Sequence, residues 1–498
     1  MTPVPFNCAA FQDCLRSFLP IMPEALLIVL AGLVMGLDLA WPESRKRGLG
    51  LVAATGFGLI ALAALAFARP AAGNPLIFGG MMRDDLVTYI FRLLFLFSGM
   101  IVSLISLDSP GVGRKGEYYA ILVSAVLGMN FMAASADLIM LYLSIETTSI
   151  ALYLLAGFLR EDDKSAESGL KYFLFGAFTS TIMLYGFSLL YGFTGKTNLY
   201  ELSAALAAGA APVAAIVVAL LLVLVGFGFK VAAVPFHFWT PDVYEGAPTP
   251  ITAFISVASK AAGFTVLTRV MLAVFPDVQS YWGPLMIVIA AFTMTLGNTL
   301  ALAQKNIKRL LAYSSIAQAG YALIGLAALS EAGVAATIFY LLTYTVTNLA
   351  AFGVVILVSG VVGSDETADY AGLSRRSPGL ALAFLVAFLS LGGMPPLAGF
   401  FGKFFVFAAA IQQGVILQKQ ELIWLAVVGV LNAIVGLYYY LIVLKVVYLY
   451  RSERDHEKIP VPRAYAVALW VCIAGIVLLG TWVGPWIGWA RAAAGNLF

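Results

Sequence analysis

The chain has 498 residues, of which 61 % are hydrophobic and only 11 % charged, a composition far outside that of soluble domains and typical of a membrane protein. Its net charge of +3 is too small and too evenly distributed to indicate nucleic-acid binding. Three cysteines without a C-x-x-C pair, two histidines, and the lack of GxGxxG or P-loop patterns argue against an iron–sulfur cluster, a structural zinc site or a nucleotide site held by this chain alone.

The apolar runs predict an all-α polytopic membrane protein. A spanning helix needs about 20 mostly apolar residues, and ten-residue alternating strands are absent. The first 20 residues lack a basic region and a cleavage motif, so no signal peptide is predicted. About 14 transmembrane helices are predicted, at residues 21–40, 48–68, 86–107, 117–135, 137–159, 170–194, 212–234, 250–274, 279–303, 309–328, 332–360, 378–410, 422–448 and 464–488.

The basic residues of the connections predict the orientation. Alternate connections on one side carry 17 lysines and arginines, and those on the other side carry six. The richer side is expected to face the cytoplasm. Because the number of spans is even, both termini are expected outside, on the periplasmic side of a bacterial cytoplasmic (inner) membrane. The richer connections are residues 45–47, 114–115, 160–171, 305–309, 375–376 and 451–463.

Four charged residues lie well inside the predicted spans: Glu146, Lys230, Lys260 and Lys403. Each costs about 2.5–3.5 kcal/mol on insertion scales. One interpretation is that Glu146 and one lysine form an ion pair that fixes the order of the helices. Three lysines for one carboxylate leave unpaired positive sites, however, which favours a use in proton transfer. Charges nearer the ends of spans are interpreted as interfacial anchors, with the role of Asp137 left open: Glu24, Asp38, Arg92, Asp137, Arg269 and Lys445.

A Glu146–Lys230 interaction predicts a way to load and unload a proton. A carboxylate about 4 Å from a lysine is worth about 4 kcal/mol at an effective dielectric of 20. That corresponds to roughly 3 pKa units. Making or loosening such a pair would change the proton affinity of the lysine.

The stretch "GFGFKVAAVPFHFWTPDVYEGAPTP" predicts a broken helix beside Lys230. Pro235 has no N–H, so a carbonyl near Lys230 loses its helical partner. Backbone freed at membrane depth is tolerated where it is buried in protein or lines a wet cavity. His237 then offers a donor and an acceptor just beyond the break, and a proton-transfer role and a packing role are equally open for it.

A second stretch, "LGGMPPLAGFFGKFFVF", predicts a similar interruption before Lys403. Two interrupted segments in corresponding positions predict an internal repeat, with breaks in helices 7 and 12. Between the two breaks, "FISVASKAAGF" places Lys260 among small residues that allow close helix approach. The expected organisation is an N-terminal three-helix segment (1–116), a first five-helix repeat (117–274), a second five-helix repeat (279–448), and a C-terminal loop and last helix (449–498).

Three stretches resemble the N-subunit family of bacterial NADH–quinone oxidoreductase, the antiporter-like membrane subunits of respiratory complex I. They are "KVAAVPFHFWTPDVYEGAPTPITAFISVASKAAGF", "QKNIKRLLAYSSIAQAGYALIG" and "GGMPPLAGFFGKFFVF". The likeness extends over essentially the whole chain. Mrp-type cation/proton antiporters and the two larger antiporter-like subunits share the general plan, but a lysine at 403 and the early end of the chain favour the N subunit.

The resemblance implies roles for five residues. Glu146 matches the family's fifth-helix glutamate, Lys230 the seventh-helix lysine, Lys260 the central eighth-helix lysine, and Lys403 the twelfth-helix lysine. His237 matches a histidine between the seventh and eighth helices. The family fold has two inverted five-helix repeats.

The resemblance also implies partners and an activity. The chain is expected to move protons within the NADH:quinone oxidoreductase complex, beside neighbouring antiporter-like subunits and lipids. FMN, iron–sulfur clusters and quinone are expected in other subunits, and no cofactor in this chain. The alternatives are a subunit of an Mrp-type cation/proton antiporter and a purely structural membrane scaffold.

Overall fold

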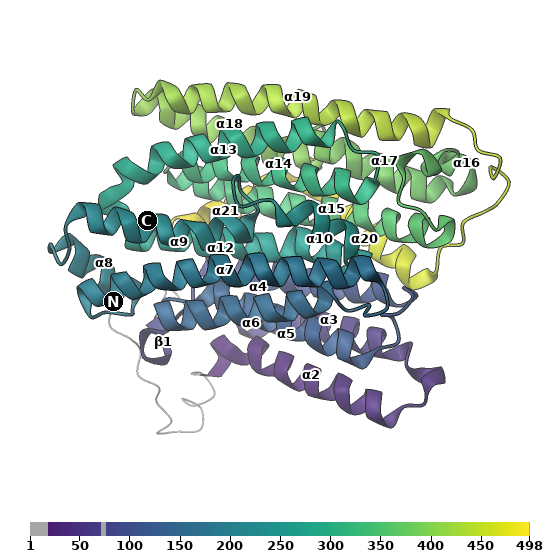
Figure 1. The fold of residues 1–498 in the computed structure, drawn as a ribbon, viewed down its shortest axis with the longest axis horizontal. Coiled ribbons are helices and arrows are strands. Elements are labelled where there is room, and N and C mark those ends of the chain that lie inside the picture. Colours follow the sequence, from purple (N-terminus) through teal and green to yellow (C-terminus); the bar gives the residue numbers. More distant parts are fainter. Residues whose placement is uncertain (1–17, 71–75, 498) are drawn as a thin grey trace.

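The computed structural model describes residues 18–70 and 76–497. Within those residues, 14 helices are long and apolar enough to cross a membrane, as the sequence predicted. Most of them run side by side across the width of Figure 1. The expectation of no signal peptide rests mainly on residues 1–17, which lie outside the described part.

The N-terminal segment contains three long helices joined by short connections. A small antiparallel ladder pairs Leu76 with Arg83 before the third helix. The elements are η1 (Leu19–Ile21), α2 (Met22–Ala40), η2 (Glu43–Arg45), α3 (Gly48–Phe67), β1 (Leu76–Ile77), η3 (Phe78–Gly80), β2 (Met82–Arg83) and α4 (Leu86–Ser106).

The middle of the chain forms the first group of five spans, the last of which contains a wide turn. These elements are α5 (Gly116–Ala134), α6 (Leu138–Ala156), α7 (Asp163–Thr194), α8 (Leu199–Ala207), α9 (Val213–Val231), α10 (Trp239–Gly246), α11 (Thr249–Phe254), the π-helical turn η4 (Ile255–Ser259) and α12 (Lys260–Val274).

The remainder forms a second group of five spans and a C-terminal pair of helices. The second group consists of η5 (Pro276–Val278), α13 (Gln279–Ala301), α14 (Ile307–Ala327), α15 (Glu331–Val362), η6 (Thr367–Tyr370), α16 (Leu373–Arg376), α17 (Pro378–Gly392), α18 (Ala398–Ile416) and α19 (Gln420–Leu449). The pair is α20 (Arg463–Thr481) and α21 (Val483–Ala494).

Three predicted spans are wrong in their extent. Residues 378–410 form two helices, α17 and α18, because the glycines and prolines between them interrupt the chain. Residues 464–488 likewise form α20 and the start of α21, with Trp482 between them in a non-helical conformation. The predicted span 170–194 begins too late, since Asp162 caps α7 by accepting from the backbone N–H of Lys164.

The two five-span groups share several local features. The third span of each group, α7 and α15, has 32 residues and ends at a left-handed glycine, Gly195 and Gly363. The second span of each group begins at a residue that forms an isolated bridge to the segment after the third span: Asp137 with Asn198, and Asn306 with Glu366.

The centre of the bundle is formed by the eighth and tenth spans. In the most apolar 18-residue stretch of Thr249–Val274 every residue is buried. In the corresponding stretch of Ile307–Ala327, 94 % of the residues are buried. The first span is only 28 % buried and lies at the edge of Figure 1. The residues that the two central spans carry are therefore shielded from lipid by the other helices.

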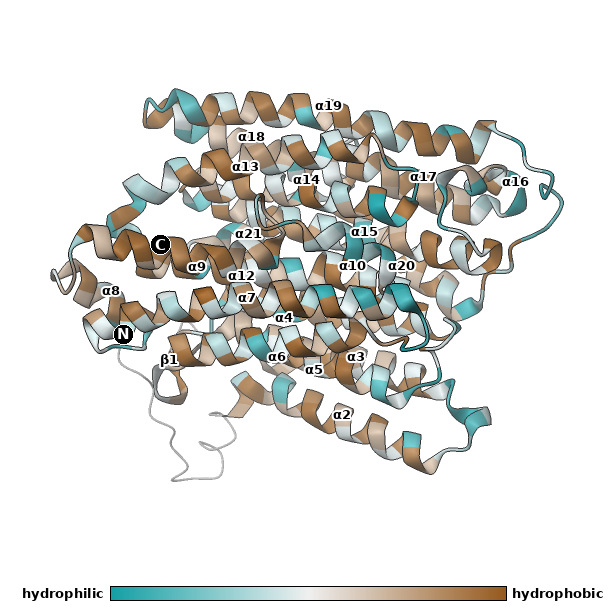
Figure 2. Ribbon diagram, in the orientation of Figure 1, coloured by the Kyte–Doolittle hydropathy of each residue, from teal (hydrophilic) through white to brown (hydrophobic). Residues whose placement is uncertain are grey.

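Polar residues gather at the ends of the helices, whereas their middles are mostly apolar (Figure 2). The basic connections at 45–47, 375–376 and 451–463 lie at one end of the molecule, on the right in Figure 1. The start of α2 and the end of α21 lie towards the opposite end. The start of α2 and the end of α21 therefore lie at the same end of the bundle, as an even number of spans predicts. The side of the membrane that this end faces stays a prediction.

Candidate functional site

The break in the seventh span lies one turn before Pro235. α9 ends at Val231, and Ala232 adopts a left-handed conformation with φ 58°. The N–H of Ala233 then bonds to the carbonyl of Gly228 at 2.8 Å, which closes the helix end. The predicted interruption is confirmed.

Lys230 lies immediately before this break and is only 4 % exposed. Its Nζ donates to Ser149 Oγ of α6 at 2.6 Å. Glu146, also on α6, instead accepts from the hydroxyl of Ser180. Among the described residues no ion pair within 4.0 Å joins Glu146 to Lys230, so the direct contact that the sequence predicted is not formed. Ser149 takes that place because it lies one turn further along the same face of α6.

His237 lies in the turn between α9 and α10 and is 4 % exposed. Its Nδ1 has no hydrogen-bond partner among the described residues. Its ring lies beside that of Phe238, tilted by 32° with centroids 4.4 Å apart. The carbonyl of Phe229 accepts from the N–H of Ala232 and from Nε1 of Trp239, both at 3.1 Å. His237 therefore adjoins the break, as predicted.

Lys260 lies at the centre of the bundle and is 2 % exposed. It follows directly after the π-helical turn η4 at the start of α12. Its Nζ donates to the carbonyl oxygen and the Oγ of Ser315, at 2.8 and 2.6 Å. Its Nζ is 5.9 Å from the centroid of the Tyr244 ring. The lysine is thus held by direct protein contacts.

Lys403 lies one turn into α18, beyond the second break, and is 5 % exposed. α17 ends at a left-handed Gly393, with φ 86°. The carbonyl oxygens of Leu391 and Gly392, freed at this end, accept from Lys403 Nζ at 2.8 and 3.3 Å. The break therefore supplies the acceptors for the lysine, which confirms the predicted association of the two.

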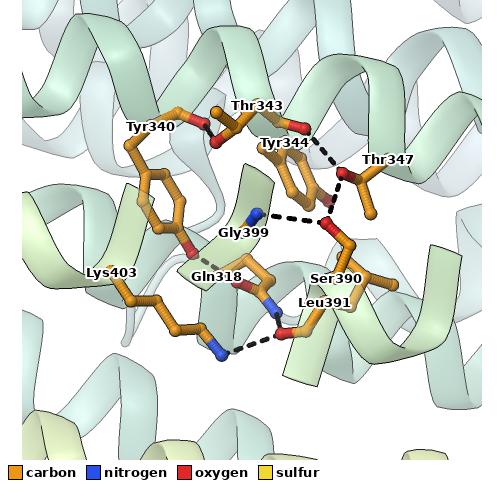
Figure 3. A pocket seen from close by; sticks show the side chains of 9 residues that line it. All are labelled: Gln318, Tyr340, Thr343, Tyr344, Thr347, Ser390, Leu391, Gly399 and Lys403. Atoms are coloured by element: carbon orange, nitrogen blue, oxygen red, sulfur yellow. Dashed lines mark hydrogen bonds between the residues drawn. The ribbon is translucent and has the colours of Figure 1, made fainter. Parts of the chain in front are cut away.

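A small polar cavity adjoins Lys403 (Figure 3). The cavity has a volume of about 10 Å³, which is enough for one water molecule. The lining residues are Gln318, Tyr340, Thr343, Tyr344, Thr347, Ser390, Leu391, Gly399 and Lys403.

Hydrogen bonds lead from Lys260 to the edge of this cavity. Tyr344 donates its hydroxyl proton to Ser315 Oγ at 2.8 Å, and Ser315 also accepts from Lys260. Tyr344 lines the cavity that Lys403 also lines. Gln318, one turn from Ser315 on α14, donates to the same Leu391 carbonyl that accepts from Lys403. Lys260 and Lys403 are therefore joined by two hydroxyls and a cavity the size of one water.

The sequence analysis did not single out these linking residues. Two of them, Ser315 and Gln318, were inside the quoted stretch "QKNIKRLLAYSSIAQAGYALIG", where they share one face of a helix. Polar side chains spaced by three in an otherwise apolar span are the signal that would have indicated them.

In the described part of the chain, closely packed side chains, and not a chain of hydrogen bonds, lie between Lys230 and Lys260. Gly263, one turn beyond Lys260, packs so closely on Lys230 that an added Cβ would lie 3.2 Å from the Cβ of Lys230. Tyr153 of α6 and Tyr172 of α7 lie in the same region, with rings 4.9 Å apart. No direct hydrogen bond joins the two lysines among the described residues.

A charge network surrounds α10 at the basic end of the molecule. Asp242 pairs with Lys171 at 2.7 Å and with Arg309 at 2.9 Å, and Glu245 pairs with Lys164 at 3.0 Å. Burial raises the pKa of Asp242, but the hydrogen bonds from Lys171 and Arg309 outweigh it and hold that pKa below its usual value. A cleft of about 750 Å³ adjoins the network and is lined in part by Lys164, Glu245, Thr249 and Lys308. This cleft opens beside the start of the helix that carries Lys260.

Within residues 18–70 and 76–497, no group of three or more His, Cys, Asp and Glu side chains has the arrangement of a metal site.

Comparisons with known proteins identify the family. The sequence profile described as NADH:quinone oxidoreductase/Mrp antiporter, TM matches residues 135–434. NADH-quinone oxidoreductase subunit N of Moorella thermoacetica is 44 % identical over 469 residues, covering 93 % of this chain and 96 % of that protein. The subunit N of Anaeromyxobacter sp. is 42 % identical over 508 residues and 97 % of each chain.

Solved structures agree with the sequence comparisons. A chain of respiratory complex I from Thermus thermophilus with bound aureothin superposes with a TM-score of 0.78, at 34 % identity over 95 % of this chain and 100 % of that one. A chain of the Mrp complex from Dietzia sp. has a TM-score of 0.80 at 23 % identity, over 97 % of each chain, which shows a shared fold alone. The chain therefore belongs to the NADH:quinone oxidoreductase/Mrp antiporter family of transmembrane subunits, in the branch of the NADH-quinone oxidoreductase N subunits.

Proposed function

We propose that this chain moves protons across the membrane through Lys230, Lys260 and Lys403, as a membrane-arm subunit of an NADH:quinone oxidoreductase. The observation that carries the proposal is the link from Lys260 through Ser315 and Tyr344 to the cavity at Lys403. Ser315 accepts from both neighbours, so transfer from Lys260 requires the Tyr344 hydroxyl to turn away from Ser315 and accept the proton that Ser315 gives up. A single water in the cavity would complete the path to Lys403.

The contacts of the three lysines suit a changing charge. Each Nζ is held by neutral oxygens, of Ser149, Ser315 or Leu391, and none has a carboxylate within 4.0 Å among the described residues. A lysine held in this way can lose or gain a proton without breaking an ion pair. Glu146 and His237 are proposed to act on Lys230 through space, Glu146 from α6, where it accepts from Ser180, and His237 from the turn beyond the first break.

We propose that the two groups of five spans are inverted repeats, covering residues 117–274 and 279–448. The two breaks support this assignment. The N–H of Ala232 bonds to the residue three before it, and that of Ala233 to the residue five before it. Gly393 and Met394 repeat both spacings. The matched lengths and glycine ends of α7 and α15 support the assignment as well.

The energy for transport comes from other subunits in this proposal. The relatives are named as subunits of NADH-quinone oxidoreductase. FMN, iron–sulfur clusters and quinone are assigned to neighbouring chains, and the exposed apolar helix faces to lipid and to other membrane-arm subunits, including antiporter-like ones. The membrane is the bacterial cytoplasmic membrane, with both ends of the chain on the periplasmic side.

The decisive test is Lys260→Met in the assembled, membrane-reconstituted complex. Lys260 is eleven residues into the span that begins at Thr249, which places it about 16 Å deep in a core of about 30 Å. Methionine keeps the volume and removes the titrating group, so assembly and NADH oxidation with an uncoupler should persist while the protons pumped per electron fall. Lys260→Arg should not restore pumping, because arginine does not release its proton.

The matched control is Lys445→Met, the same change at an exposed lysine of α19. If Lys260→Met pumps at the ratio of Lys445→Met, the proposed path is wrong. Mild detergent extraction separates the alternative, an Mrp-type antiporter subunit: the proposal expects flavin- and iron–sulfur-containing subunits in equal stoichiometry. Recovery with cation/proton antiporter subunits and no flavin would favour the alternative.

A further inference from the structure

Six charged residues meet inside the protein at the end opposite the basic connections, at the start of α2 and the end of α12. The sequence analysis interpreted three of them, Glu24, Arg92 and Arg269, as interfacial anchors, and that interpretation is wrong. All six are at most 6 % exposed, so they do not reach the interface. The outer cluster, as we call it, consists of Glu24, Arg83, Asp84, Asp85, Arg92 and Arg269.

Two of the three carboxylates in the outer cluster form ion pairs. Asp85 accepts from both Nη atoms of Arg269, at 2.8 and 3.0 Å, and lies 3.3 Å from Arg83 Nε. Glu24 accepts from Arg92 Nε at 2.8 Å. Asp84 has no ion pair or hydrogen bond among the described residues, although it is buried between these pairs in sequence and space. It is therefore the carboxylate left free to bind a proton.

Several buried polar atoms in and near the outer cluster also have no hydrogen-bond partner among the described residues. They are Oε2 of Glu24, Nε of Arg83, Nη1 of Arg92, Nε of Arg269, and both side-chain polar atoms of Asn130. Asn130 is fully buried on α5, one turn before Ala133, whose carbonyl accepts from Arg269. Buried polar groups are normally satisfied by protein or by ordered water. Six such atoms in one region indicate that the outer cluster holds water.

The outer cluster is connected to the central lysine by one helix. Arg269 is nine residues beyond Lys260 on α12, which corresponds to about 14 Å along the axis. A small cavity lies between the two levels, with about 10 Å³ open to a water centre. It is lined by three threonines, Thr265, Thr268 and Thr337, and by seven apolar residues.

We propose that Asp84 is a second proton-binding site, which receives a proton from Lys260 along α12 and releases it at this end of the protein. The proposal rests on the proposed function of Lys260. In the transfer, an N–H bond of the Lys260 ammonium breaks, the proton moves through water at the threonines, and an O–H bond forms on Asp84. The lysine and the carboxyl are both neutral afterwards.

The charges around Asp84 allow it to titrate near physiological pH. Burial raises the pKa of Asp84 to about 6; Arg92 opposes the rise, and Asp85 and Glu24 add to it. The charged or titratable groups that face the outer cluster from the elements packed around it are Glu24 of α2, Arg83 and Asp85 beside β2, Arg92 of α4, Tyr200 of α8 and Arg269 of α12.

The test is Asp84→Asn in the complete complex, with Asp137→Asn as the matched control. Both aspartates are 6 % exposed, and Asp137 only caps α6, a role that asparagine fills as well. Infrared difference spectra of the wild type should contain a protonated-carboxyl band that appears as the pH falls through about 6. Asp84→Asn should lose this band and pump fewer protons per electron. Asp137→Asn should keep both the band and the wild-type number of protons per electron.

Asp84→Glu keeps a carboxyl and guards against failure of the asparagine variant to assemble. It should keep the band but shift its frequency or its midpoint. A band unchanged in Asp84→Glu or retained in Asp84→Asn would overturn the assignment, and so would pumping by Asp84→Asn at the ratio of Asp137→Asn. Loss of pumping in Lys260→Met with normal pumping in Asp84→Asn would reject this site alone, whereas normal pumping in Lys260→Met would reject the proposed function.

Discussion

Ser315 is the residue whose removal tests the link between the central and twelfth-helix lysines most directly. Its hydroxyl accepts from Lys260 at 2.6 Å and from Tyr344 at 2.8 Å. Ser315→Ala deletes the hydroxyl but leaves the Ser315 backbone carbonyl, which accepts from Lys260 at 2.8 Å, so the lysine keeps one anchor. The change therefore interrupts the path without releasing the lysine.

The size of the effect follows from the bonds that are lost. A hydrogen bond to a charged group is worth about 1.5–3 kcal/mol, and at about 1.36 kcal/mol per factor of ten this corresponds to a roughly ten- to hundredfold slower transfer. Protons pumped per electron should fall accordingly in reconstituted vesicles. NADH oxidation measured with an uncoupler should stay at the wild-type level, because no redox group is touched.

Ser106→Ala is the control for stability. Ser106 is also fully buried, and its hydroxyl bonds to that of Tyr118 at 2.8 Å, far from the lysines in sequence. Both variants lose a buried serine–tyrosine contact and should lower the thermal midpoint of the complex to a similar degree. If Ser315→Ala and Ser106→Ala pump equally well, Ser315 is a structural hydroxyl and the path runs elsewhere.

Three further predictions follow from other contacts. Gly399→Ala would place a Cβ 1.9 Å from the carbonyl oxygen of Ser390, so we expect loss of assembly, measured by native gels; normal assembly would contradict the close packing at the second break. Glu146→Asp shortens the reach to Ser180 by one methylene and should reduce pumping less than Glu146→Ala does; equal losses would argue against a role for that contact. The pKa of Asp242 is lowered in the folded protein. Its contribution to stability is therefore present above the unfolded-state pKa of about 3.9 and is lost as the pH falls through the folded-state pKa. The difference in thermal midpoint between wild type and Asp242→Asn should thus persist from pH 7 to about 4 and shrink below; a difference that shrinks already near pH 6 would refute this.

The sequence predicted the spans and the breaks well because both depend on local composition. A run of about 20 apolar residues has few alternatives to a spanning helix, and the glycines and prolines around 235 and 395 interrupt it wherever it folds. The burial of Lys230, Lys260 and Lys403 followed from their places in those runs.

The partners of these residues could not be predicted in the same way. The ammonium of Lys230 bonds to Ser149 and not to Glu146, because the rotation of α6 about its axis decides which of two neighbouring polar residues faces α9. Arg269 and Asp85 are 184 residues apart in the chain, and no local pattern indicates that they meet. Arginines near the ends of spans suit an interface equally well by composition, so only the packing of α12 against α4 distinguishes the two.

Because of the π-helical turn η4, the direction in which the Lys260 side chain points depends on the number of residues before it. A π-helical turn contains one residue more than the α-helical turn it replaces, and each residue of an α-helix rotates the side chains beyond it by roughly 100°. Deleting one residue between Ile255 and Ser259 would leave every side chain of α12 intact and yet swing Lys260 away from α14. The direction of the lysine is thus encoded by the length of the chain before it, and a single-codon deletion there would disable it while the lysine codon itself stayed unchanged.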